Sequence, residues 1–305
     1  MRPIAPMPRR RVVLAGLAVA ALTACSGHPA PAQPVDPNPP VPPTDEGIEA
    51  LERRYNVIVG LSAVDVPSGR RLTHRAEDRF AMCSTFKGYA AAAVLQKSER
   101  GELALSDAVT IEPADIISHS PVTRTRVGAT MTLAELCQAA VQVSDNGAAN
   151  WLLRVLGGPS AITDFARSIG DEESRLDRWE IELNSAIPGD PRDTSTPLAL
   201  GIGYRNLLAG SALEVASRRQ LKNWMLANET SSLRAGLPAG WTSADKSGAG
   251  GYGTTNDIGI AYAPDGHRLL LSIMTRSAIE DPEAPNQRPP IGEVAALAVE
   301  RLYQR

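Results

Sequence analysis

The chain has few aromatic residues, few cysteines, few histidines and almost no excess charge. Phe, Trp and Tyr make up 4% of its 305 residues, which disfavours surfaces that stack bases or glycans on aromatic rings. A formal net charge of −3 argues against the basic footprint of a nucleic-acid-binding protein, so we expect no nucleic-acid partner. The hydrophobic content of 43% excludes a disordered chain and allows one large globular domain.

Cysteine and histidine are too scarce for a disulfide scaffold or a metal centre. The whole chain has three cysteines, Cys25, Cys83 and Cys137, and four histidines. The spacing of the cysteines matches no metal-binding motif. We therefore expect a reaction that uses no metal and no other cofactor.

The N-terminal segment is typical of an export signal. The apolar run from Val12 to Leu22 follows three arginines, and it is shorter than the roughly 20 residues that a transmembrane helix needs. Residues 22–25, Leu-Thr-Ala-Cys, resemble a lipobox, in which Cys25 is lipidated. An ordinary signal peptide cleaved nearby is the alternative. Both Sec and twin-arginine export stay open. We expect a lipoprotein on the outer face of the cytoplasmic membrane, or a periplasmic or secreted protein.

Prolines are concentrated between residues 29 and 43, where an extended polyproline-type chain is favoured and no core can be buried. This segment is typical of a spacer between a membrane anchor and a folded domain. We predict a lipoprotein-type signal peptide over residues 1–24, an anchor and Pro-rich linker over 25–44, and a folded domain over 45–305.

The folded part has strand patterns at both ends and helix patterns in the middle. An antiparallel sheet from the two chain ends, flanked by helices, is therefore predicted: an α/β (α+β) subdomain over about 45–75 and 228–305, with an all-helical subdomain over about 76–227. Pockets favour such boundaries. The strands are predicted over 57–64, 70–73, 241–246, 256–262 and 268–274, and the helices over 44–54, 84–100, 133–142, 146–156, 160–169, 213–228 and 291–303.

Ser84 and Lys87 form an S-x-x-K motif at the start of an apolar helical run. A spacing of three places both side chains on one helix face, where the amine can take or relay the hydroxyl proton. Alone, this motif more often marks a capping serine and a solvated lysine. Here the apolar residues 88–93 follow directly, which indicates that Lys87 is buried, and a buried lysine requires a reason.

Two further short motifs follow along the chain, Ser-Asp-Asn at 144–146 and Lys-Ser-Gly at 246–248. By itself the first is a common turn or helix-cap sequence, and the lysine of the second is a strand-end residue that is usually solvated. Together and in this order, S-x-x-K, S-D-N and K-[ST]-G resemble the motif set of serine β-lactamases and penicillin-binding proteins.

A fourth segment favours one branch of that superfamily. Residues 178–184 read Arg-Trp-Glu-Ile-Glu-Leu-Asn and resemble the E-x-E-L-N segment of class A β-lactamases, with Glu180 as the carboxylate and Asn184 as its partner. The flanking residues 175–177 and 186–194 also match. The resemblance covers most of the folded part. It implies a serine β-lactamase/DD-peptidase-like fold, hydrolysis of the β-lactam ring of penicillins and cephalosporins, and antibiotic resistance.

The resemblance also implies a role for each matched residue. Ser84 is the expected nucleophile, and either Lys87 or Glu180 is the base for acylation. Ser144 passes a proton to the leaving nitrogen, and Glu180 with Asn184 holds the water that deacylates the enzyme. The expected partner is a small-molecule β-lactam bound by a monomer, with membrane contact only through a lipid on Cys25. Substrate binding is expected from Asn146, Lys246, Ser247, Gly248 and Ala249, and the last shares the oxyanion hole with Ser84.

Several positions depart from the family pattern. The arginine that usually follows the position of Lys246 is absent, and Arg288 is our candidate for supporting carboxylate binding. His119 stands where relatives often have an aromatic pocket wall, so it either stacks on the substrate or is an exposed loop residue. Ile181 replaces a proline at a peptide bond that relatives often hold cis.

The cysteines also depart from the pattern. The residue that would pair with Cys137 in relatives is Ala91, and the one that would pair with Cys83 is Gly250, so neither bridge can form. We expect both thiols to be small buried residues. The resemblance further predicts an ion pair between Arg178 and Asp193 at the neck of the loop that carries Glu180.

Other functions stay open at this point. A DD-peptidase acting on cell-wall stem peptides would share Ser84 and Lys87 but would not need Glu180 and Asn184. A non-enzymatic antibiotic sensor would be acylated and stay acylated. A lipoprotein binding module with a decayed site is disfavoured, because every expected side chain is present.

Overall fold

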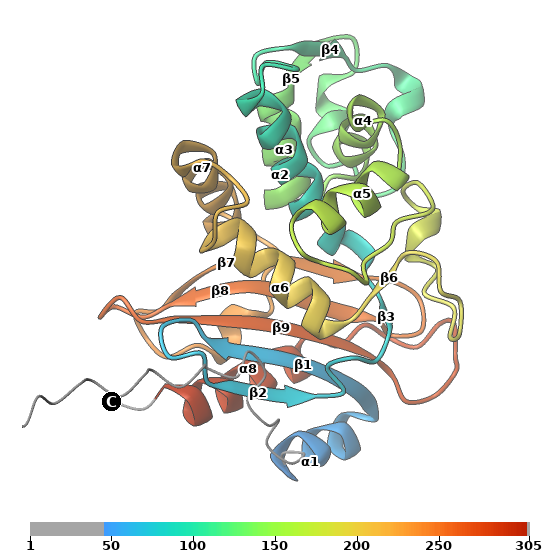
Figure 1. Cartoon of the computed structure of the whole chain (residues 1–305). Coiled ribbons are helices and arrows are strands. Elements are labelled where there is room, and N and C mark those ends of the chain that lie inside the picture. The colour runs from blue at the N-terminus through green and yellow to red at the C-terminus, as the bar shows by residue number, and fades with distance from the viewer. Residues whose placement is uncertain (1–45, 304–305) are drawn as a thin grey trace, which may run out of the picture. The chain divides into compact units, whose positions relative to one another are not determined.

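A computed structural model describes residues 46–303 and contains a five-stranded antiparallel sheet built from both ends of this segment (Figure 1). Each pairing between neighbouring strands is antiparallel. The prediction of one such sheet from the two chain ends is therefore confirmed. In sheet order the strands are β2 (Arg71–His74), β1 (Val57–Asp65), β9 (Arg268–Ser277), β8 (Thr255–Tyr262) and β7 (Thr242–Ala249).

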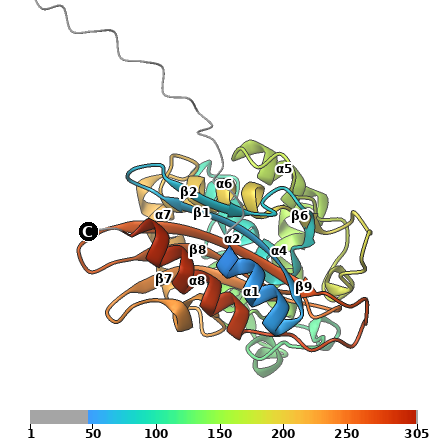
Figure 2. The same ribbon diagram turned by 90° about the horizontal axis from the view of Figure 1, so that it is seen from below.

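Helices cover both faces of the sheet. α1 (Glu46–Tyr55) and α8 (Pro289–Leu302) lie side by side on one face and enclose an apolar cluster with β1 and β9 (Figure 2). α6 (Pro197–Leu208) packs on the other face against β1, β8 and β9. Because a strand covered on both faces has no solvent-facing side chains, β1 and β9 are buried almost continuously instead of in alternation.

The middle of the chain forms a helical part around α2 (Phe86–Glu99), which is buried from Phe86 to Leu95. Its run of alanines lets the neighbouring helices pack closely. α3 and α4 have the bounds that the sequence predicts, because Thr132 and Asp145 cap their first turns. The helices packed on α2 are α3 (Leu133–Gln142), α4 (Asn146–Leu156), α5 (Ser160–Ser168) and α7 (Val215–Leu226).

Two short ladders add strands to this helical part, which the sequence predicted to contain helices alone. β3 (Phe80–Ala81) pairs with β6 (Thr194–Ser195), and β4 (Ala108–Thr110) pairs with β5 (Thr130–Thr132). Strands of two or three residues are too short to show a period-two pattern, which is why they were not predicted. Short 3₁₀ turns are η1 (Cys83–Thr85), η2 (Pro113–Asp115), η3 (Thr123–Arg126), η4 (Glu182–Asn184) and η5 (Leu233–Gly236).

The signal peptide and the Pro-rich linker predicted for residues 1–44 lie outside the described residues, and so does Cys25. Within residues 46–303, none of the helices has the length and apolar character needed to cross a bilayer. The same residues contain no group of His, Cys, Asp and Glu side chains that could hold a metal ion. The division of the folded part into two subdomains stays a prediction.

Candidate active site

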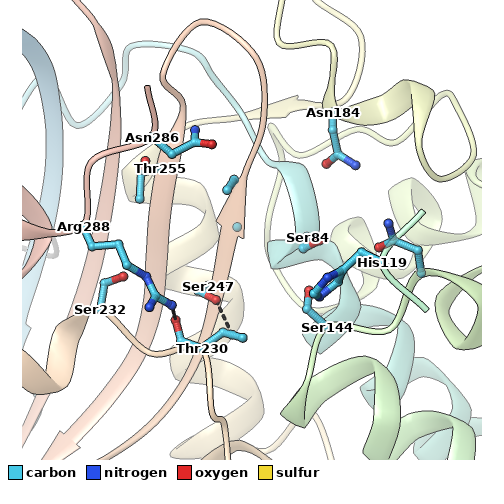
Figure 3. A pocket seen from close by; sticks show the side chains of 13 residues that line it. Ser84, His119, Ser144, Asn184, Thr230, Ser232, Ser247, Thr255, Asn286 and Arg288 are labelled. Carbon is cyan, nitrogen blue, oxygen red and sulfur yellow. Dashed lines mark hydrogen bonds between the residues drawn. The ribbon is translucent and has the colours of Figure 1, made fainter. Parts of the chain in front are cut away.

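A cavity of about 380 Å³ lies between the edge strand β7 and the helical part (Figure 3). Lys87, Glu180 and Lys246 are buried beside it rather than lining it. Most of the other residues named from the sequence line it: Ser84, His119, Ser144, Asn146, Asn184, Ser247, Gly248, Ala249 and Arg288. Four lining residues were not predicted: Thr230, Ser232, Thr255 and Asn286.

Ser84 lies in the turn η1, immediately before α2. The preceding residue, Cys83, has a backbone φ of +46°, a conformation that is costly for a residue other than glycine. On the other side of the turn, a Cβ atom at Gly248 would lie 3.1 Å from the Ser84 nitrogen and 2.9 Å from the Met82 oxygen. Only glycine therefore lets β7 approach the serine turn this closely, which explains the glycine of the Lys-Ser-Gly motif.

The Lys87 ammonium group is fully buried and surrounded by oxygen atoms. Its Nζ lies 2.9 Å from Ser84 Oγ, 2.9 Å from Glu180 Oε1 and 2.5 Å from Asn146 Oδ1. It also donates to the backbone oxygen of Ser144 at 2.9 Å. A buried charge is tolerated only when it is paired and hydrogen-bonded, so these partners explain how the fold keeps an amine beside the serine hydroxyl.

The Glu180 carboxylate faces Ser84 and is shielded from solvent. Its Oε1 lies 3.4 Å from Ser84 Oγ, and its Oε2 accepts a hydrogen bond from Asn184 Nδ2 at 2.5 Å. The side chain of Asn150 holds the Glu180 backbone, with 3.0 Å hydrogen bonds to its N–H and its C=O groups. Asn150 was not predicted, although its place one helical turn after Asn146 was a usable signal.

The loop that carries Glu180 contains a cis peptide bond between Glu180 and Ile181, and an ion pair closes its neck. Arg178 Nε donates to Asp193 Oδ2 at 2.5 Å, so the predicted pair is confirmed. Asp193 Oδ1 accepts the backbone N–H groups of residues 177 and 178 at 2.7 and 2.9 Å. The Asp193 carbonyl accepts the N–H of Met82 at 2.8 Å, which ties the neck to the serine turn.

Ser144 lies between the two buried lysines. Its Oγ is 3.3 Å from Lys87 Nζ and 3.2 Å from Lys246 Nζ. Burial and the positive charge of Lys87 lower the pKa of Lys246 to about 7, and the buried carboxyl groups of Asp257 and Asp245 oppose that shift. The Ser144 hydroxyl is therefore placed to exchange a proton with a lysine that can change its charge near neutral pH.

Ser247 and Arg288 lie on the sheet side of the cavity (Figure 3). Ser247 Oγ is 2.6 Å from Thr230 Oγ1, and Arg288 Nη2 donates to the backbone oxygen of Thr230 at 2.5 Å. A hydroxyl and a guanidinium on the same wall are the kind of groups that bind a carboxylate. Arg288 therefore lines the cavity beside Ser247, and its role in carboxylate binding stays a prediction.

Asn146 and His119 line the cavity on the side of the helical part. Asn146 Nδ2 donates to the backbone oxygen of Ser118 at 2.8 Å, and this uses one of its two N–H groups. His119 has a φ of +56°, and its Nε2 lies 3.0 Å from the backbone oxygen of Val143. His119 is exposed in a loop and borders the cavity, and its stacking on the substrate stays a prediction.

Cys83 and Cys137 are free and fully buried, as predicted. Burial raises the pKa of both thiols far above the ordinary value for cysteine. A thiol that does not ionise is a poor nucleophile, so these residues act as small apolar side chains.

Known proteins resemble this chain in sequence and in structure. Residues 43–302 match the family described as "Beta-lactamase enzyme family". β-Lactamase AST-1 of Nocardia asteroides is 42% identical over 299 residues, covering 96% of each chain. β-Lactamase CTX-M-8 of Citrobacter amalonaticus is 46% identical over 255 residues, covering 83% of this chain and 87% of the other. The structure of an ancestral (GNCA) class A β-lactamase has a TM-score of 0.80 and 48% identity, covering 84% of this chain and 98% of the other.

Proposed function

This chain belongs to the β-lactamase enzyme family, as a class A β-lactamase that hydrolyses β-lactams and thereby confers resistance, and we propose that it does so through an acyl-enzyme on Ser84. The reaction has two steps. The strained four-membered amide must first open and acylate the serine, and a water molecule must then release the product.

In the first step, Ser84 Oγ attacks the lactam carbonyl. Its proton passes through a water to Glu180, or to Lys87 Nζ, 2.9 Å away, after the lysine has given one of its own protons to Glu180 Oε1, which also lies 2.9 Å from it. The backbone N–H groups of Ser84 and Ala249 stabilise the oxyanion, and one such donor contributes about 3–4 kcal/mol in other hydrolases. Ser144, in contact with Lys246, then protonates the leaving nitrogen.

In the same step, Ser247 and Arg288 on the cavity wall hold the carboxylate of the substrate, and the charge of Lys246, buried beside the cavity, attracts it. The guanidinium and the hydroxyl offer hydrogen bonds to that group, and the one from the guanidinium is charge-assisted. Asn146 binds the carbonyl of the substrate side chain with its remaining N–H. These contacts place the lactam carbonyl beside Ser84 and not elsewhere in the cavity.

The position of Glu180 is the observation that carries the proposal. A buried carboxylate that lies 3.4 Å from Ser84 Oγ and is hydrogen-bonded to Asn184 can deprotonate a water beside the acyl carbon. Positioned general-base catalysis contributes about 10²–10⁴-fold, and the fixed orientation of the water adds to it. A DD-peptidase or an antibiotic sensor has no need for this pair of side chains.

Glu180→Gln should therefore be acylated and then stall. Mass spectrometry after addition of benzylpenicillin should show a persistent adduct of one penicillin per chain, whereas the wild type returns to its unmodified mass. Glu182→Gln is the matched control, because Glu182 lies in the same loop with its side chain in solvent. Undiminished turnover of a chromogenic cephalosporin by Glu180→Gln would refute the proposed deacylation.

We also propose that the enzyme is an exported monomer, held at the outer face of the cytoplasmic membrane by a lipid on Cys25. The support is the basic, then apolar, then lipobox-like sequence of the first 25 residues. Cells that express the wild type should incorporate labelled palmitate into the protein, and cells that express Cys25→Ala should not. Equal labelling of both would reject the anchor.

A further inference from the structure

A chain of hydrogen bonds leads from the buried Asp245 to the cavity wall at Ser247. Asn228 Nδ2 donates to Asp245 Oδ1 at 2.5 Å. Asn228 Oδ1 accepts the backbone N–H and the hydroxyl of Thr230 at 2.9 and 2.7 Å. Thr230 Oγ1 lies 2.6 Å from Ser247 Oγ. Asp245 and Asn228 are fully buried, whereas Thr230 and Ser247 line the cavity, so the chain connects the interior to the substrate side.

The chemistry of the donors sets the direction of these bonds. The backbone N–H of Thr230 can only donate, so its partner on Asn228 is the carbonyl oxygen, and the amide nitrogen faces Asp245. That carbonyl oxygen can only accept, so the Thr230 hydroxyl gives its single hydrogen to Asn228. Ser247 must then donate its own hydroxyl hydrogen to Thr230 Oγ1 in the protein without substrate.

In this arrangement Ser247 turns an oxygen lone pair, not a hydrogen, toward the cavity. A carboxylate is an acceptor, so its binding requires the Ser247 hydrogen to rotate toward it. Thr230 can compensate, because its own hydrogen can rotate from Asn228 to Ser247 Oγ. Asn228 Oδ1 then still accepts the backbone N–H of Thr230 and is not left without a partner.

Thr230 also contacts Arg288, the other cavity residue proposed to bind the substrate carboxylate. Its backbone oxygen accepts the hydrogen bond from Arg288 Nη2, so one residue is bonded to both Ser247 and Arg288 (Figure 3). The two contacts use different parts of the residue. Removing only the side-chain hydroxyl therefore tests the link to Ser247 and keeps the link to Arg288.

We propose that Thr230 is a positioning residue that makes the cavity selective for anionic substrates. When a carboxylate binds, the two hydroxyl hydrogens reverse, and Ser247 donates to the ligand while it accepts from Thr230. A hydroxyl that accepts a hydrogen bond becomes a stronger donor, so Thr230 strengthens the bond from Ser247 to the ligand. A neutral ester is a weaker acceptor and gains less from this reversal. The inference rests on the proposed role of Ser247 in binding the β-lactam carboxylate.

The test compares benzylpenicillin with its methyl ester as substrates of the wild type, Thr230→Val, Thr230→Ser and Ser247→Ala. Valine keeps the shape of threonine and removes the hydroxyl. For Thr230→Val we expect KM for the acid to rise about three- to tenfold, the range of one net hydrogen bond, with KM for the ester and kcat unchanged. Thr230→Ser should restore the wild-type ratio of the two KM values. In the Ser247→Ala background, Thr230→Val should have no further effect.

The outcomes separate this inference from the proposed function. If Ser247→Ala loses the preference for the acid and Thr230→Val keeps it, the inference is overturned and the role of Ser247 stands. If Ser247→Ala itself keeps the preference, the proposed role of Ser247 fails first. Equal increases of KM for acid and ester in Thr230→Val would reduce Thr230 to a structural residue. Thr230→Ala, which also lacks the hydroxyl, provides the same comparison should the valine variant not fold.

Discussion

Asp193→Asn removes the ionic part of the loop neck while changing little in size. In the wild type, one carboxylate oxygen of Asp193 accepts two backbone N–H groups and the other accepts Arg178 Nε. Asparagine can keep the first oxygen, but it places an N–H₂ group against the Arg178 N–H. Asp193 is fully buried, whereas the Arg178 side chain is 19% exposed and can partly recover its hydration. We therefore expect a loss of about 2 kcal/mol, below the 3–5 kcal/mol of a fully buried pair.

For a domain of this size, a loss of about 2 kcal/mol corresponds to a fall in Tm of about 4–8 °C. Turnover of a chromogenic cephalosporin should fall about tenfold or more, because a loosened neck lets Glu180 and Asn184 drift from the acyl carbon. Mass spectrometry should show the acyl-enzyme accumulating when Lys87 is the base for acylation, since Ser84, Lys87 and Ser144 lie outside the loop.

Asp190→Asn is the matched control for this change. Asp190 belongs to the same loop, and its main ion pair is with Arg192 near the surface, while Arg178 lies 4.0 Å away. We expect little change in Tm or turnover. If Asp193→Asn melts and turns over like the wild type, the neck pair does not hold the loop. If Tm and turnover fall as much in Asp190→Asn as in Asp193→Asn, the cause is the charge of the loop and not the buried ion pair.

The helices that were predicted correctly are those in which capping residues and an apolar face in the sequence match the packing found in the fold. α3 and α4 begin after capping residues and carry apolar faces that pack on α2, so their bounds follow from the sequence. α6 was not named, because two glycines lower its helix propensity. For one of them, Gly203, the reason is tertiary: the Tyr89 ring occupies the space of a side chain there, just as the Tyr204 ring does at Gly88 of α2.

In the active site, too, some residues can be recognised from the local sequence and others only from tertiary contacts. The residues proposed to perform chemistry belong to short ordered motifs, and the fold brings them together within hydrogen-bond distance of one another. Asn150, Asn228 and Thr230 belong to no motif. They act by holding other residues, and their partners can be far along the chain: Asn150 reaches Glu180 over 30 positions, and Thr230 reaches Ser247 over 17. Only the folded arrangement shows such contacts.

Two further predictions follow from packing and from charge. Gly203→Ala should destabilise the protein by about 1–3 kcal/mol, because its Cβ would collide with Tyr89. At Gly201 an added Cβ would have ordinary contact distances, so Gly201→Ala should melt like the wild type or slightly above it. Equal melting temperatures of the two variants would contradict this packing. Because the pKa of Lys246 is lowered to about 7, its positive charge is present below that pH and is lost above it, so KM for benzylpenicillin should rise as the pH increases through about 7. The unfolded chain holds that proton up to the ordinary lysine value of 10.5, so the free energy of unfolding should rise from about pH 7 up to that value. Lys246→Arg keeps its charge and should flatten the rise in KM, and a wild-type KM independent of pH in this range would show that another group holds the carboxylate.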